Sequence, residues 1–378
     1  MKLTNFFYLF ILLLFTACQN SDTKERYGNW QLDDFVKVDS LNPILEPSSD
    51  QIFNCPLTEQ PVRWEERNVL NPAAVVKDGL VHLFYRAQDS TGTSRIGLAI
   101  SSDGLHFKKE PAPVFYPAED ALKSYEWNYK KISGEAIPED CKTCLFDGVE
   151  DPRLVKLEDG RYLLTYTAYD GKTARLSLAS STDLRTWQKH GLVISDPLYR
   201  DAWSKAGAIV TRREGTDFIA TKIDGLYWMY FGDTDLFMAS SEDGINWQIA
   251  ENEENGSPIS VLHPRPGYFD SRLVEPGPFA LLQEEGIVLI YNASNAANFK
   301  DPDLPKFTYA AGQALFSKER PYQLLDRSAS YFIHPDKDYE RVGEVNEVCF
   351  VEGLVYFQDK YFLYYGTADS KIAVAVRD

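Results

Sequence analysis

The sequence is short of positive charge. Its 378 residues include 39 lysines and arginines against 56 aspartates and glutamates, which gives a formal net charge of −17 at pH 7. A surface of this sign repels phosphate backbones and anionic lipid headgroups. The composition therefore argues against nucleic acid and against an anionic membrane surface as partners, and it is compatible with a neutral substrate such as a sugar.

Cysteine and histidine are also scarce, with five of each in the chain. Cys141 and Cys144 form a lone Cys-x-x-Cys pair without the second pair that a structural zinc site needs, so a local disulfide is the alternative. Cys349 lies between Val348 and Phe350, as expected of a buried free thiol. Because no His, Cys and Asp residues are grouped at the spacing of metal ligands, the sequence predicts no metal and no cofactor.

An apolar run near the N-terminus, Phe6 to Phe15, is too short to span a membrane as a mature helix. It follows Lys2 and leads into Thr-Ala-Cys18, which resembles a bacterial lipobox. We therefore predict a lipoprotein signal peptide over residues 1–18, lipidation of Cys18 and a polar tether over residues 19–28. The predicted location is periplasmic or at the cell surface, with membrane contact only through the lipid. A leader without lipidation is the alternative.

Aromatic residues are abundant, at 13% of the chain, which favours strands over a helical bundle. Five times an acidic or glycine-containing turn leads into a β-rich run. Gly and Asp tolerate the positive φ that tight hairpins require. The five runs cover residues 77–89, 158–170, 223–235, 285–294 and 359–369.

A second motif follows the β-rich runs, with a fixed step of eight residues from an alanine to an aromatic residue. Its copies pair Ala99 with Phe107, Ala179 with Trp187, Ala239 with Trp247 and, in degenerate form, Ala314 with Tyr322. A strand, a hairpin turn and a second strand with an outer aromatic residue are typical of a propeller blade. We therefore predict an all-β fold, a five-bladed β-propeller over residues 29–378. A β-sandwich would not explain the paired motifs.

The segment Phe146-Asp-Gly-Val-Glu-Asp-Pro-Arg153 packs three carboxylates and an arginine into eight residues. Pro152 fixes its own φ and is expected to push Asp151 into an extended conformation, so the segment is not a helix. We interpret it as a rigid turn that holds a catalytic Asp151 beside Arg153 as its orienting partner. A buried ion pair that pins a loop to a sheet is the alternative.

Further carboxylates end the β-rich runs, which we take to be the inner strands of the blades. Inner strands converge on the propeller axis, so these carboxylates, together with Arg86 and Arg95, are expected to form a polar pocket of sugar size. The carboxylates are Asp89, Asp170, Asp233 and Asp369.

Taken together, these residues resemble glycoside hydrolase family 130. The motifs that carry the resemblance occur in order over essentially the whole mature chain, as Asn71-Pro-Ala-Ala, Phe84-Tyr-Arg-Ala, Thr93-Ser-Arg-Ile-Gly, Gly148-Val-Glu-Asp-Pro-Arg153 and Tyr364-Tyr-Gly-Thr-Ala-Asp369. Members of that family are five-bladed propellers that act on β-mannosides. Most are inverting phosphorylases, and a smaller branch hydrolyses β-1,2-mannosides. The resemblance implies that Asp151 is the catalytic acid, acting through a sugar hydroxyl. It also implies a set of ligands to the mannose in the −1 subsite, namely Asn71, Arg86, Arg95 and Asp369.

The chain departs from the phosphorylase pattern where phosphate would bind. The resemblance implies a lysine where Leu273 stands, a glycine at Glu275, a histidine at Asn292 and a small neutral residue at Glu352. Phosphate needs cationic or N–H donors, whereas a carboxylate suits the base that activates water in an inverting hydrolase. Glu275 and Glu352 are therefore our candidates for the base, with a structural carboxylate or a sugar ligand as the alternative for each. Lys205 is a remaining cation that keeps a phosphorylase open.

The sequence thus predicts an inverting exo-β-mannosidase that acts on β-1,2-linked manno-oligosaccharides, with Asp151 as acid and Glu275 or Glu352 as base. The predicted substrate-binding residues are Asn71, Arg86, Asp89, Arg95, Arg153, Lys205, Asp233 and Asp369. Four tryptophans either stack on sugar rings or pack in the core, namely Trp64, Trp127, Trp203 and Trp228. A phosphorylase that uses inorganic phosphate and a non-catalytic glycan-binding lipoprotein are the alternatives.

Overall fold

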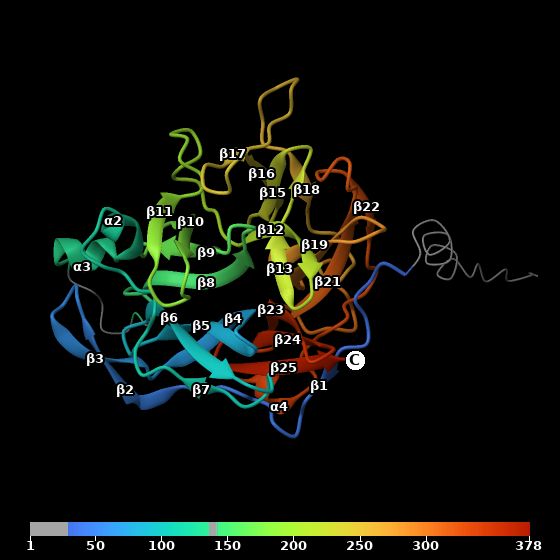
Figure 1. The fold of residues 1–378 in the computed structure, drawn as a ribbon. Helices are drawn as coiled ribbons and strands as arrows, with labels where there is room; N and C mark the ends of the chain where they lie inside the picture. Colours follow the sequence, from blue (N-terminus) through green and yellow to red (C-terminus); the bar gives the residue numbers. More distant parts are fainter. Residues whose placement is uncertain (1–28, 136–140, 142) are drawn as a thin grey trace, which may run out of the picture.

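The computed structural model describes residues 29–135, 141 and 143–378, and it confirms the predicted all-β, five-bladed propeller (Figure 1). The predicted signal peptide, Cys18 and the tether over residues 19–28 lie outside the described residues. Within the described ranges, no helix has both the length and the apolar character that crossing a bilayer would require.

Each blade is an antiparallel sheet, and the first strands of the blades contact one another around the axis. The first blade contains β4 (Asn68–Lys77), β5 (Leu80–Gln88), β6 (Thr93–Ser101) and β7 (Lys108–Lys109). The second contains β8 (Asp147–Lys156), β9 (Tyr162–Tyr169), β10 (Ala174–Ser181) and β11 (Gln188–Leu192). The third contains β12 (Gly207–Glu214), β13 (Asp217–Ala220), β14 (Lys222–Ile223), β15 (Leu226–Phe231), β16 (Leu236–Ser241), β17 (Gln248–Ile249) and β18 (Ser260–Leu262).

The last two blades complete the ring. The fourth contains β19 (Leu273–Leu282), β20 (Ile287–Ser294), β21 (Tyr309–Phe316) and β22 (Leu324–Arg327). The fifth contains β23 (Cys349–Phe357), β24 (Lys360–Thr367), β25 (Lys371–Arg377) and β1 (Val36–Lys37). Outside the blades lie the hairpin of β2 (Ser48–Cys55) and β3 (Gln60–Glu65), and the short helices α2 (Lys123–Glu126), α3 (Tyr129–Ser133) and α4 (Asp338–Arg341).

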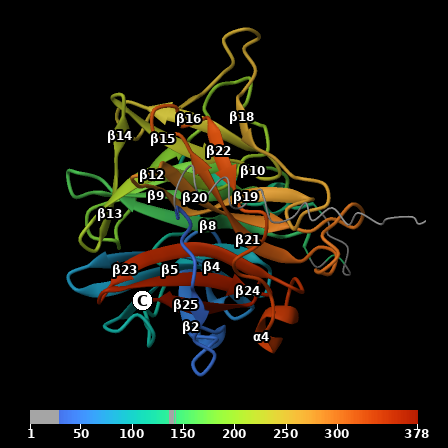
Figure 2. The ribbon, with the colours of Figure 1, turned by 90° about the vertical axis from the view of Figure 1, so that its right-hand side faces the viewer.

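The two ends of the chain meet in the fifth blade. The N-terminal strand β1 pairs antiparallel with β25, through Val36 with Val376 and Lys37 with Ala375. Lys37 Nζ lies 2.7 Å from the buried carboxylate of Glu340, which also accepts a hydrogen bond from the Tyr365 hydroxyl. Figure 2 shows this blade beside β4 and β5 of the first blade, so residues from the start of the chain close the ring.

The five β-rich runs form the second strand of each blade, so our assignment of these runs as inner strands is wrong. Each is preceded by another strand that lies innermost. These inner strands were hard to recognise because they contain prolines such as Pro72, Pro152 and Pro276, which lower strand propensity. The predicted turns are confirmed: Asp78 and Gly79, between β4 and β5, have φ values of 52° and 72°.

The second motif is the connection from the third to the fourth strand of a blade. Asp103 Oδ1 accepts hydrogen bonds from the backbone N–H groups two and three residues on, both at 2.9 Å, and Asp183 and Asp243 do the same in the next two blades. The aromatic residue that follows packs on the second strand of the preceding blade. Trp187 meets Phe84 edge-on, with ring centroids 5.8 Å apart.

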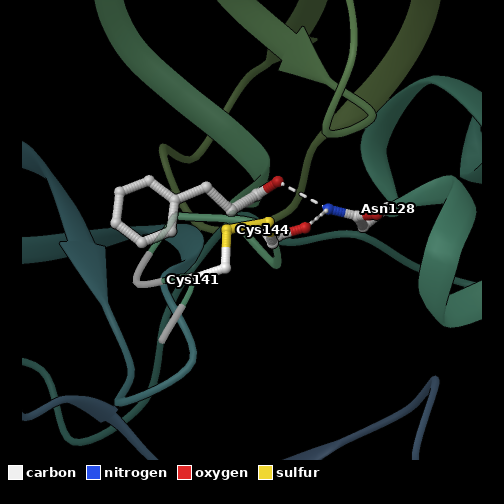
Figure 3. Close-up of a disulfide and its surroundings, with 4 residues drawn as sticks. Asn128, Cys141 and Cys144 are labelled. Carbon is white, nitrogen blue, oxygen red and sulfur yellow. Dashed lines mark hydrogen bonds between the residues drawn. A yellow bond between two sulfur atoms is a disulfide. The ribbon is translucent and has the colours of Figure 1, made fainter. Parts of the chain in front are cut away.

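Cys141 and Cys144 form a disulfide between α3 and β8, which confirms the local pairing considered from the sequence (Figure 3). The Asn128 side chain donates to the carbonyl oxygens of Cys144 and Phe146, both at 3.0 Å, and thereby holds this loop. Cys349 is a buried free thiol, as expected.

Candidate active site

Four inner strands carry bulges at comparable positions; Asp151 and Glu352 lie in these bulges, and Glu275 lies just before one. The pairing of β4 with β5 skips Asn71, and the pairing of β23 with β24 skips Glu352. In β8 the pairing skips Asp151 and its neighbour, and in β19 a wider irregularity follows Glu275 and Pro276. A bulge leaves its extra residue unpaired and re-aims the side chain. The bulges therefore bring polar groups from different blades together.

These bulges correct two expectations. Asp151 belongs to β8, whereas the sequence suggested a turn at this position, and Glu275 belongs to β19. Asp151 is also not extended, because its φ is 50°, and Asn71 has a matching φ of 49°. Asp and Asn tolerate this left-handed conformation better than most residues. The prolines fit because a bulge does not need their missing N–H groups.

Asp151 is buried among donors from the first blade and from the connection that precedes β12. Its Oδ1 accepts hydrogen bonds from Asn71 Nδ2 at 2.7 Å and from Arg86 Nη1 at 3.0 Å, and its Oδ2 lies 3.8 Å from Lys205 Nζ. Burial would raise the pKa of Asp151, but the charges of Arg86, Lys205 and Arg153 outweigh burial and hold the pKa well below its usual range. Asp151 is therefore ionised in the empty site.

Glu150 is a site residue that the sequence analysis missed. Arg86 binds both neighbouring carboxylates, with Nη2 donating to Glu150 Oε1 at 2.6 Å while Nη1 reaches Asp151. The Ser94 hydroxyl donates to the same Glu150 oxygen at 3.0 Å. Burial raises the pKa of Glu150 to about 7 despite the opposing charge of Arg86. Adjacent strand residues normally face opposite sides, so only the bulge brings Glu150 and Asp151 to one arginine.

Arg153 holds the two candidate bases instead of presenting free donors. Its Nε and Nη2 donate to the carbonyl oxygens of Gly277 and Pro276, at 3.0 and 2.9 Å, and Nη1 donates to the Asp151 carbonyl oxygen. The same Nη2 lies 2.7 Å from Glu352 Oε1 and 3.7 Å from Glu275 Oε1. The guanidinium thus ties the bulge of β8 to that of β19.

The pKa values of both candidate bases are raised, which disfavours their ionised forms. Burial raises the pKa of Glu275 to about 8, although Lys205 opposes the shift. Burial raises the pKa of Glu352 well above its usual value, although Arg153 opposes it. Glu275 is consequently able to ionise near neutral pH.

Several buried polar atoms at the site lack a hydrogen-bond partner among the described residues. They are Asn71 Oδ1, Glu275 Oε1 and both carboxylate oxygens of Glu352. Glu352 Oε1 lies close to Arg153, but without the angle of a hydrogen bond. Buried polar groups are almost always satisfied in native proteins. These atoms therefore mark where a polar ligand such as a hydroxylated sugar or water fits.

Asp369 and Asp233 belong to the same cluster. Burial raises the pKa of Asp369 to about 6, with the nearby charges of Arg86 and Asp151 acting in opposite directions. Asp233 is among the carboxylates that raise the pKa of Lys205, and its Oδ2 accepts a hydrogen bond from Trp203 Nε1 at 3.1 Å. The structure therefore brings these two strand-end carboxylates to the catalytic candidates.

Asp89 and Arg95 lie in a different place. Arg95 Nη1 donates to Asp89 Oδ2 at 2.8 Å, and both side chains line a cavity of about 650 Å³ beside Cys55, Trp127 and Lys131. Within the described part of the chain, neither side chain bonds to the cluster around Asp151. The strand-end Asp170 likewise pairs with Arg175, at 2.7 Å. Asp89 and Asp170 were expected to point into the pocket on the propeller axis. Each instead pairs with an arginine on the next strand of its own blade.

At two positions where the resemblance implies phosphate ligands in phosphorylases, the side chains here are buried. Asn292 is fully buried, and its side chain donates to the Val351 carbonyl oxygen at 2.9 Å and accepts from the Val351 N–H at 2.7 Å. It thereby joins the fourth blade to the fifth. Leu273 is buried at the start of β19. Neither side chain offers a donor to an anion.

Comparison with known proteins places this geometry in context. Residues 36–378 match the family model described as beta-1,4-mannooligosaccharide phosphorylase, glycoside hydrolase family 130. A 1,2-beta-oligomannan phosphorylase of Thermoanaerobacter sp. (strain X514) is 29% identical over 90% of this chain and 97% of its own.

Solved structures are similar as well. A glycosyl hydrolase from Bacteroides ovatus has a TM-score of 0.84 and 37% identity, covering 92% of this chain and 95% of its own. Another structure, described among the GH130 glycoside hydrolases that target beta-1,2 mannosidic linkages in Candida mannan, has a TM-score of 0.86 and 38% identity, covering 93% of this chain and 95% of its own.

Proposed function

Because this chain belongs to glycoside hydrolase family 130, we propose that it is an inverting, exo-acting β-mannosidase that hydrolyses β-1,2-linked manno-oligosaccharides. Enzymatic action on mannosides follows from the family, and the choice of linkage rests on the two relatives described as acting on β-1,2-linked mannans. The choice of water over phosphate rests on the charge of the site.

The charge balance of the site is the observation that carries the proposal. Three cations, Arg86, Arg153 and Lys205, face a larger set of carboxylates, namely Glu150, Asp151, Asp233, Glu275, Glu352 and Asp369. Even with Glu275 and Glu352 protonated, the two carboxyls whose pKa values burial raises most, four carboxylates remain against three cations, so no surplus positive charge is left for a phosphate dianion. Phosphate sites need charged or N–H donors in excess. Water has no such requirement.

In the proposed mechanism, Asp151 is the general acid and Glu275 or Glu352 is the base that activates water. Glu275 is favoured, because its pKa of about 8 lets it ionise near neutral pH. In the empty site the proton is on Glu275 and Asp151 is ionised. The reactive state, with the proton on Asp151 and Glu275 ionised, contains the same number of protons, so substrate binding has only to relocate one of them.

The deciding assay is release of mannose from β-1,2-mannobiose with and without millimolar phosphate. We expect free mannose at a rate indifferent to phosphate, and an inverted anomeric configuration by NMR at early times. Mannose 1-phosphate that appears only with phosphate would contradict the proposal. The absence of either product would favour a glycan-binding protein.

Substitution of the acid tests the assignment of roles. We expect Asp151→Asn to lower turnover by about 10²-fold or more, since general acid catalysis contributes this much. The circular dichroism spectrum and unfolding midpoint should change little, because Asn can still accept from Asn71 and Arg86. Near-native activity in this variant would remove Asp151 from the mechanism.

A phosphorylase is the second candidate, and Lys205 is the observation that favours it. Its ammonium group lies 3.8 Å from Asp151 Oδ2 and is partly exposed. Lys205→Met should abolish any phosphate-dependent product if this candidate is correct.

We also propose that the protein is exported and lipid-anchored at Cys18. The lipobox-like Thr-Ala-Cys18 and the disulfide between Cys141 and Cys144 support this location, because disulfides persist in oxidising compartments. Cys18→Ser should release the protein from the membrane fraction. Unchanged membrane association would contradict the anchor.

A further inference from the structure

Trp203 differs from the three other tryptophans that the sequence offered as sugar-stacking residues. Its exposed fraction is 51%, against 0% for Trp64 and 8% for Trp127. Trp228 is partly buried, and its indole N–H donates to the Ile223 carbonyl oxygen. Single exposed aromatic residues are common on protein surfaces, so what distinguishes Trp203 is its position beside the candidate site.

The Trp203 ring is fixed in place at the edge of the catalytic cluster. Its indole N–H donates to Asp233 Oδ2 at 3.1 Å, and Tyr169 packs against it with ring centroids 6.2 Å apart and planes at 65°. Lys205 Nζ lies 6.0 Å from the ring centroid and 3.8 Å from Asp151 Oδ2. One side chain therefore separates the indole from the candidate acid.

We propose that the exposed face of Trp203 is the platform on which the leaving-group sugar of the substrate stacks. This inference rests on the proposed function, since it needs a glycoside cleaved beside Asp151. The C–H face of a pyranose is apolar and its hydroxyls lie at the edge, which suits an indole that presents a flat apolar surface with a polar atom at its rim. The hydrogen bond to Asp233 and the contact with Tyr169 orient the ring before the sugar arrives.

Kinetics with two substrates test the platform. β-1,2-Mannobiose has a leaving-group sugar, whereas β-mannosyl fluoride has none. We expect Trp203→Ala to lower the ratio of kcat/KM for mannobiose to kcat/KM for the fluoride by about tenfold, the scale of one aromatic contact. Trp203→Phe should lower the ratio less, because it keeps a ring but loses the N–H. Equal losses in both variants, on both substrates, would mean that Trp203 only orients Asp233, and would overturn the proposal.

Binding without turnover provides a second readout. In an Asp151→Asn background, titration with β-1,2-mannobiose should change the intrinsic tryptophan fluorescence. Trp203→Phe should abolish that change, and Trp228→Phe, a matched loss of a tryptophan away from the site, should retain it. A change that persists without Trp203 would overturn the platform. If the wild-type chain cleaves no substrate but the fluorescence change maps to Trp203, the proposed function fails and the leaving-group role of Trp203 fails with it, although Trp203 contacts the bound sugar.

Discussion

Asp151 and Glu275 share one proton at neutral pH. Nearby cations lower the pKa of Asp151, and burial raises the pKa of Glu275 to about 8. In the proposed mechanism that single proton has to be on Asp151 when the glycosidic bond breaks. The proton leaves the pair as the pH rises through the Glu275 pKa, so activity should fall on the alkaline side.

The pH profile of kcat/KM for β-1,2-mannobiose should therefore have its upper limb near pH 8. Free-enzyme ionisations appear in kcat/KM, so this parameter is the one to measure. An upper limb at pH 4 to 5, about the ordinary range of a carboxyl, would show that Glu275 does not hold the proton.

Glu150 affects the protonation of Asp151, because Arg86 binds both carboxyl groups. When Glu150 is ionised it shares the guanidinium with Asp151, which makes the Asp151 proton easier to acquire. We expect Glu150→Gln to remove this negative charge and lower the pKa of Asp151 further. Fewer molecules would then carry the reactive proton above about pH 7, where Glu150 is ionised, so kcat/KM should fall about tenfold there and change little at lower pH.

The control for this prediction is Ser94→Ala, which removes a hydrogen bond to Glu150 but no charge. It should have a smaller effect than Glu150→Gln. If the two variants behave alike, Glu150 acts through geometry and its charge is irrelevant.

At the level of strands and connections, β1 depends on a buried ion pair. Lys37 Nζ faces Glu340, whose side chain is fully buried, and β1 is short, with two residue pairs joining it to β25. Lys37→Met should cost about 3–5 kcal/mol in the free energy of unfolding, because it leaves a buried carboxylate without its cation. Urea unfolding measures the loss, and Lys37→Met with Glu340→Gln should recover part of it. A loss below about 1 kcal/mol would mean that the pair is solvated in solution.

The contrast between repeats and bulges shows what the sequence can reveal. Hairpin turns such as Asp78-Gly79 and the connections built on Asp103, Asp183 and Asp243 are local, so their residue types predict a chain of repeated blades. The bulges depend on pairing between strands, and Pro152 suggested a turn where β8 continues. The sequence therefore revealed the blades but assigned their inner strands to the wrong segments.

The candidate site was predictable to the same limited extent. The family pattern pointed to Asp151, which matches the motif of the catalytic acid. It also pointed to Glu275 and Glu352, which stand where phosphorylases have other residue types. Glu150 was missed because strand alternation places it on the opposite face from Asp151. Asp89 and Arg95 were misplaced with respect to the cluster, because no local signal shows that they pair with each other.

For the whole molecule, residues near the N-terminus complete the fifth blade. They therefore determine how much of the N-terminus can be removed without loss of stability. Removal of residues 1–28 leaves every described strand in place, so we expect the unfolding temperature to be unchanged. Removal through residue 38 deletes β1 and the interactions of Trp30 and Leu32 with the fourth blade. That variant should unfold several degrees lower in calorimetry. Equal melting temperatures would show that the fifth blade is stable without β1.

The bulges also bear on how such a protein acquires new chemistry over generations. In a regular strand, residues that face the substrate alternate strictly with residues that pack between blades. A shift of one residue in the strand would therefore move both sets to the wrong face. The extra residue at Glu352 resets that alternation before Leu354 enters the hydrophobic core. Substitutions confined to the bulges therefore leave the packing between blades in place, and a lineage can exchange one acceptor molecule for another without rebuilding its scaffold.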